Sequence, residues 1–235
     1  MQRAVYDQLM AARAAKTPAV LATFLRTGEQ RLLFPGGTKV ADDPAIIDAA
    51  RAATMADRSA TIETASGPLF LNVFNPPLRM AVVGAVHVTQ ALAPMAAMAG
   101  YEVTVIDPRR AFGSEQRFPG VDLSNAWPDE AMNEFRPDLR SAVVTLTHDP
   151  KLDDPALTVA LRSNCFYIGA LGSRKTHATR LDRLRRAGFT DSDLARIRGP
   201  VGLAIGARSP AEIALSILAE VTQTLRQASV EDVAA

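Results

Sequence analysis

Five groups of polar and glycine residues lie at positions where a ligand could bind, and four of the five carry side chains or glycines suited to a small polar or anionic ligand. Each group directly follows a short apolar run, at residues 84–87, 107–110, 147–149, 169–175 and 206–209. Short apolar runs that alternate with helical segments are typical of strands buried in a parallel sheet. In an open parallel sheet, ligands bind beyond the carboxyl ends of the strands. The five groups therefore predict one ligand-binding edge.

The group at residues 169–175 (GALGSRK) is the best candidate for an anion site. Its glycines let the backbone approach a ligand, Ser173 is a natural N-cap, and the next helical turn offers free N–H groups at the positive end of the helix dipole. Arg174 and Lys175 stand where the dipole favours acids, at a local cost of about 0.3–1 kcal/mol each that a bound phosphate would offset. We predict Gly172, Ser173, Arg174 and Lys175 as ligand-binding residues. The alternative is that both cations are merely solvated.

The turn that begins at Gly84 lies where a dinucleotide fingerprint G-x-G-x-x-G would lie, but only its first glycine is present. Val86 and Thr89 occupy the other two glycine positions. The second glycine normally lets the backbone approach a pyrophosphate, and the methyl groups of Val86 would obstruct that approach. NAD(P) binding is therefore disfavoured. Asp107, at the end of the next apolar run, matches the acid that binds a ribose hydroxyl, or it only begins a loop.

His148 and Asp149 form a polar pair after the third apolar run. A histidine at the end of a strand can be a general base, a ligand contact or a structural group, and the sequence leaves these three roles open. The acids that follow, Asp153 and Asp154, are expected to cap the next helix.

Neither metal catalysis nor acyl transfer is expected. The three histidines and the single cysteine lack the spacing of metal ligands, and there is no G-x-S-x-G nucleophile motif. Cys165 begins an apolar run, so we expect a buried, inert thiol.

The elements that must position these groups form an α/β domain over residues 79–235. Apolar strands are predicted at residues 80–84, 102–107, 142–146, 166–168 and 201–205, with a less regular stretch through Trp127. Helices are predicted from residue 88 to a stop at Gly100, and at 152–162, 173–187 and 209–226, the last opened by a capping box at Ser209–Glu212. Strands that alternate with helices imply right-handed crossovers. We therefore predict a Rossmann-like, doubly wound parallel sheet.

Residues 1–78 are predicted to form a small α+β domain. An amphipathic helix over residues 1–15 precedes a strand at 18–25 and a turn at Gly36-Gly37. Asp43, or Asp42 before it, caps a second helix, and residues 61–63 and 69–74 form a hairpin. Pro76-Pro77 then serves as a linker.

Charge and composition exclude several classes of protein. A formal net charge of +1 argues against a nucleic-acid binder that neutralises many phosphates. No stretch approaches the roughly 18 apolar residues of a membrane span, and the amphipathic first segment is not a secretion signal. A single cysteine cannot form an internal disulfide, which fits a reducing compartment. We expect a cytoplasmic protein.

Five short blocks follow one another at residues 147–153, 167–174, 199–203, 205–207 and 210–214. In this order they resemble the XdhC/CoxI family, the accessory factors for xanthine dehydrogenase and related molybdenum hydroxylases. Residues 84–88 (GAVHV) are similar to the family's Gly-Ala-Gly-His-Val, and residues 1–78 resemble its first domain loosely, as in residues 19–23.

The resemblance implies a protein that binds the molybdenum cofactor, protects it and passes it to an apo-hydroxylase client, without turnover of its own. It implies that the cofactor site is lined by Gly84, His87, His148, Asp149, Gly172, Ser173 and Arg174. A homodimer is a further expectation from the family.

Three departures from the family pattern leave alternatives open. Val86 replaces a glycine and Ala204 replaces the usual aspartate, and the first domain lacks a Gly-Ser-rich turn with cysteine and glutamate. A second XdhC/CoxI-type subunit would then supply the missing part. The alternatives are an NAD(P)-dependent oxidoreductase, suggested by the topology and Asp107, and a subunit that docks on the hydroxylase with a degenerate pocket.

Overall fold

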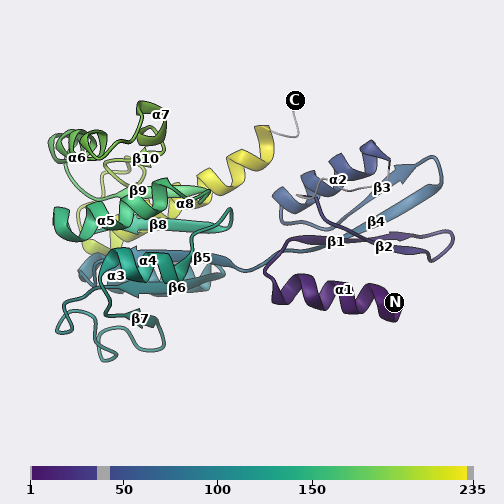
Figure 1. Cartoon of the computed structure of the whole chain (residues 1–235), viewed down its shortest axis with the longest axis horizontal. Helices are drawn as coiled ribbons and strands as arrows, with labels where there is room; N and C mark the ends of the chain where they lie inside the picture. The colour runs from purple at the N-terminus through teal and green to yellow at the C-terminus, as the bar shows by residue number, and fades with distance from the viewer. Residues whose placement is uncertain (1, 36–42, 232–235) are drawn as a thin grey trace. The chain divides into compact units, whose positions relative to one another are not determined.

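The computed structural model describes residues 2–35 and 43–231, and its internal contacts divide the chain into two compact units (Figure 1). One unit comprises residues up to Pro76 together with those from Arg226 onward, and the other comprises Pro77–Leu225. The predicted turn at Gly36-Gly37 and the alternative cap Asp42 lie outside the described residues.

The first unit is a four-stranded antiparallel sheet with a helix on each face (Figure 1). Its elements are α1 (Arg3–Ala14), β1 (Ala19–Phe24), β2 (Gln30–Leu33), α2 (Pro44–Met55), β3 (Ala60–Thr64) and β4 (Gly67–Phe74), with the strand order β2-β1-β4-β3. The Asp43 carboxylate accepts a hydrogen bond from the Ala45 N–H at 3.0 Å, so Asp43 caps α2 as predicted. The predicted hairpin is confirmed as β3 and β4, with Gly67 at a φ of +104° in its turn.

The second unit is a six-stranded sheet in which every neighbouring pair of strands is parallel. The strands are β5 (Leu78–Val83), β6 (Tyr101–Ile106), β7 (Asp122–Ser124), β8 (Ser141–Thr145), β9 (Tyr167–Ala170) and β10 (Ile197–Arg198), in the order β10-β9-β8-β5-β6-β7. The chain fills one side of β5 first and then continues with β8 on the other side. This is the predicted Rossmann-like, doubly wound arrangement.

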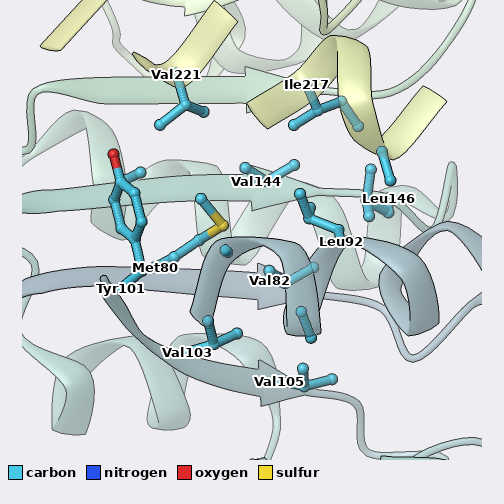
Figure 2. Close-up of a cluster of buried hydrophobic side chains, with 14 of the residues drawn as sticks. Met80, Val82, Leu92, Tyr101, Val103, Val105, Val144, Leu146, Ile217 and Val221 are labelled. Carbon is cyan, nitrogen blue, oxygen red and sulfur yellow. The ribbon is translucent and has the colours of Figure 1, made fainter. Parts of the chain in front are cut away.

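Helices cover both faces of this sheet, as expected for strands that are apolar on both sides. They are α3 (His87–Met98), α4 (Pro128–Phe135), α5 (Pro150–Leu161), α6 (Arg174–Arg186), α7 (Asp191–Leu194) and α8 (Pro210–Glu231). On one face, Met80, Val82 and Val144 pack against α3 and α8 (Figure 2). On the other face, Val83 and Val143 pack against α4, α5 and α6. None of the helices in the described part of the chain is long and apolar enough to cross a membrane.

Three predictions about local structure are wrong. Residues 201–205 do not form a strand, because Gly202 adopts a φ of +95°, which interrupts an extended backbone; the edge strand is β10 instead. The irregular stretch before Trp127 contains β7, and α4 follows it unpredicted, with Pro128 in its first turn. Neither Asp153 nor Asp154 caps α5. Because Pro150 begins that helix earlier than predicted, the cap is Asp149.

Candidate functional site

The turns that follow β9, β8, β5 and β6 lie side by side at the carboxyl edge of the sheet, because these four strands are consecutive in the strand order. The chain reverses direction across the sheet between β5 and β8, which is the topological switch point where α/β proteins bind ligands. Direct contacts join the turns after β8, β5 and β6, and two buried side chains from α5 and α6 link the turn after β8 to the turn after β9.

The turn after β5 is held close to the turn after β8. Gly84 has a φ of +110°, and a Cβ atom at this position would lie only 2.6 Å from Cγ2 of Thr147. The buried Thr89 hydroxyl donates a hydrogen bond to the Gly84 carbonyl, so Thr89, which replaces a fingerprint glycine, is part of the turn itself. Val86 occupies the N-cap position of α3 but provides no side-chain cap, and His87, the first residue of the helix, is exposed. The first N–H groups of α3 therefore face this edge without a capping side chain.

Asp107 is 1% exposed and connects the turn after β6 to the turn after β5. Its carboxylate accepts hydrogen bonds from the Ala85 N–H at 2.8 Å and from the Arg109 guanidinium at 2.8 and 2.9 Å. Burial acts to raise the pKa of Asp107, but the hydrogen bonds from Arg109 and Ala85 outweigh it and hold the pKa below its ordinary value. A ribose hydroxyl would have to compete with Arg109 for this carboxylate. Arg109 lies within the predicted polar group at residues 107–110, but nothing in the sequence singled it out as a site residue.

The pair that follows β8 lies at the solvent-facing side of the same edge. His148 is exposed and has a φ of +64°, which is uncommon for a residue other than glycine and is often found at functional sites. Asp149 is exposed and accepts a hydrogen bond from the Lys151 N–H at 2.9 Å, as the N-cap of α5.

The turn after β9 has the local geometry that the sequence predicts for an anion site. The Ser173 hydroxyl caps α6 by accepting a hydrogen bond from the Thr176 N–H at 3.1 Å. Gly172 has a φ of +150°, and a Cβ atom there would lie 3.1 Å from the Thr176 side chain. Arg174 and Lys175 are exposed, and no ion pair joins either of them to another described residue. Their N–H groups, in the first helical turn, have no intrahelical acceptor.

Two buried charged side chains, Asp153 and Arg180, lie behind these turns, and neither was predicted from the sequence to belong to the site. Asp153 of α5 and Arg180 of α6 are each 1% exposed, with 3.5 Å between the Asp153 carboxylate and the Arg180 guanidinium. Burial raises the pKa of Asp153 and lowers the pKa of Arg180. Asp153 lies with Leu152 and Ala156 on the buried side of α5. An acidic residue within this apolar stripe could have identified Asp153 from the sequence.

Of the nine predicted site residues, the structure brings all to the carboxyl edge, but with different exposure. His87, His148, Asp149, Ser173, Arg174 and Lys175 are exposed; Gly172 is partly buried; Gly84 and Asp107 are buried. The exposed members offer N–H groups of two helix N-termini, two cations, two imidazoles and the Asp149 carboxylate. This arrangement is suited to holding an anionic ligand.

The remaining candidates for chemistry contribute little. Cys165 is buried, and burial raises the pKa of its thiol, which matches an inert side chain. Among the residues described, no group of three or more His, Cys, Asp or Glu side chains is placed to hold a metal ion.

Two curated proteins are similar in sequence to this chain over roughly two thirds of its length. It is 35% identical over 163 residues to a protein of Bacillus subtilis named as a probable subunit of xanthine dehydrogenase, covering 69% of this chain and 47% of the relative. It is 34% identical over 148 residues to the molybdenum cofactor insertion chaperone PaoD of Escherichia coli, covering 63% of this chain and 40% of the relative. The chain thus spans less than half the length of these two relatives.

A solved structure shares the fold. It is described as a xanthine dehydrogenase from Bacillus halodurans, and it matches 96% of this chain and 66% of its own chain with a TM-score of 0.68 and 24% sequence identity. The family model for the XdhC Rossmann domain matches residues 80–221, which is more than half of the chain and includes every turn of the carboxyl edge. The chain therefore belongs to the XdhC family.

Proposed function

We propose that this chain is a maturation chaperone that binds the molybdenum cofactor as its cargo and delivers it to a hydroxylase of the xanthine dehydrogenase or CO dehydrogenase type. The observation that carries the proposal is that α3 and α6 both begin at the carboxyl edge of the sheet, where Arg174 and Lys175 are exposed and form no ion pair with another described residue. The name of the Escherichia coli relative, a molybdenum cofactor insertion chaperone, supports the same role.

The residues at the edge fit the chemistry of this cargo. The molybdenum cofactor carries a phosphate and a polar pterin, and free N–H groups at helix N-termini bind phosphate. Arg174 and Lys175 add positive charge, and His148 and Asp149 add polar groups for a pterin. The cargo remains intact, so these residues need only bind it and release it.

The oxidoreductase alternative has less support, because Asp107 already accepts hydrogen bonds from Ala85 and Arg109. A protein that docks on the hydroxylase without cargo is the third interpretation. A second XdhC/CoxI-type subunit, a homodimer and a cytoplasmic location stay predictions; size-exclusion chromatography with light scattering tests the first two.

The deciding experiment measures cofactor in protein purified anaerobically from a host that makes molybdenum cofactor. The bound fraction is oxidised in acid and its fluorescent pterin quantified, with metal content measured in parallel. A nearly stoichiometric amount of pterin is expected, and protein from a host unable to make the cofactor is the control. Folded protein that carries nucleotide but no pterin would refute the proposal. Activity gained by an apo-hydroxylase after mixing with the loaded chain then tests delivery.

A further inference from the structure

Asp153 and Arg180 form a charged pair that has almost no contact with solvent and so cannot itself bind cargo. Each side chain is 1% exposed, and the pair joins two neighbouring helices, α5 and α6. Both helices begin at the carboxyl edge, with Asp149 and Ser173 as their N-caps. The pair lies directly behind the turns that carry those caps.

Asp153 holds the turn that follows β8. Its carboxylate accepts a hydrogen bond from the Thr147 hydroxyl at 2.6 Å and from the His148 N–H at 3.2 Å. The second bond fixes the backbone of the residue whose φ is +64°. A positive φ costs free energy for a residue other than glycine, and this hydrogen bond helps to offset that cost.

Arg180 holds the turn that follows β9. Its guanidinium donates a hydrogen bond to the Leu171 carbonyl at 2.8 Å. The same nitrogen lies 3.7 Å from the position where Gly172 would carry a Cβ atom, so it packs against the back of the glycine turn. Asp153 and Arg180 therefore connect the two turns to each other through one ion pair.

The geometry of the Asp153–Arg180 ion pair does not favour a role that is only stabilising. The charges are 3.5 Å apart, and two Arg180 nitrogens, Nε and Nη1, are buried without a hydrogen-bond partner among the described residues. Buried ion pairs often contribute no more stability than well-packed apolar side chains would. A pair that is poorly satisfied internally but well bonded to two turns is better explained by what it positions.

We propose that Asp153 and Arg180 are positioning residues of the cargo site, which lock the turns at residues 147–149 and 171–173 in one relative arrangement so that both contact the same ligand. This inference rests on the proposed function for the identity of the ligand. The part that concerns the two turns depends on the structure alone.

The same two helices provide a matched control. Asp154 and Arg183 also pair α5 with α6, at 2.5 and 2.9 Å, but this pair is partly exposed and makes no hydrogen bond to either turn. Asp153→Asn and Asp154→Asn are thus the same substitution at adjacent positions, and only the first removes a charge that holds the turns.

The first measurement is amide hydrogen exchange of the full chain. Loss of a charge-assisted hydrogen bond should accelerate exchange in peptides covering residues 146–149 and 171–173 by about tenfold or more in Asp153→Asn, with no change in Asp154→Asn. Unchanged exchange in Asp153→Asn, or equal acceleration in both variants, would overturn the inference whether or not the chain binds cofactor.

The second measurement is pterin content per folded protein, with the native chain as reference. Asp153→Asn should retain about tenfold less cofactor than Asp154→Asn. Because Asp153→Asn leaves Arg180 buried without its partner and can lower stability, the double variant Asp153→Asn/Arg180→Met is included; it removes both charges and should regain stability but not cofactor. Recovery of both would show that the pair only stabilises the fold and would overturn the inference. Absence of pterin from the native chain would instead refute the proposed function, while the exchange measurement would still decide the inference.

Discussion

Replacing Gly84 by alanine tests the close approach of two turns at the switch point. A methyl group there would meet Thr147 Cγ2 at 2.6 Å and the Thr147 backbone nitrogen at 3.3 Å. Forcing an atom into a packed site costs about 1–3 kcal/mol. The φ of +110° adds a backbone cost of about 1–3 kcal/mol for any residue with a Cβ atom. We therefore expect Gly84→Ala to lower the free energy of unfolding by about 2–6 kcal/mol, the sum of the two costs.

Gly100 separates the two contributions. Its φ is +92°, and a Cβ atom there would have no heavy atom within 4 Å. Gly100→Ala should therefore show the backbone cost without the steric cost. Thr147→Ser removes the Cγ2 atom but keeps the hydroxyl that bonds Asp153, so it should restore part of the stability lost in Gly84→Ala. The non-additive part of this double-mutant cycle measures the clash itself.

Scanning calorimetry is the assay, because Gly84 and Gly100 lie in the same compact unit and report on the same transition. Each kcal/mol lost should lower Tm by about 2–4 °C in a protein of this size. Gly84→Ala should unfold at a lower temperature than Gly100→Ala. Equal Tm values for the two variants, or no recovery with Thr147→Ser, would refute the argument that backbone proximity requires glycine at position 84.

Three further substitutions test the ligand-binding edge. Arg174→Ala should weaken cofactor binding by about 1.5–3 kcal/mol, the contribution of one charge-assisted hydrogen bond, and an unchanged Kd would remove Arg174 from the site. Val86→Gly should bind nucleotide better than the native chain does, and calorimetry that shows no gain would mean that steric obstruction was not the reason for weak binding. Asp107→Asn should reduce stability near neutral pH. Because the pKa of Asp107 is held below its ordinary 3.8 in the folded chain, the stability that its charge contributes is present above that pH and is lost as the pH falls further, so native and variant unfolding curves should converge in acid. A difference that stays constant down to strongly acidic pH would contradict this assignment.

Many local features of the fold could be predicted because their interactions span only a few residues. Ser173 caps α6 through Thr176, three residues away, and Glu212 accepts the N–H groups of Arg208 and Ser209 in the predicted capping box. The strands were recognisable because burial on both faces requires continuous apolar runs. Where these local signals were weak, as for the two-residue strand β10, the prediction was wrong.

The sequence by itself determined which residues begin and end most elements, and therefore which polar groups follow the strands. Only the tertiary structure decided how those groups are connected, because the order of strands in a sheet depends on packing between distant segments. Asp107 is bonded to Ala85, 22 residues away, and Asp153 is paired with Arg180, 27 residues away. Neither pairing follows from local propensity. A buried charge is stable only where a partner from another element reaches it, and that partner is fixed when the helices pack on the sheet.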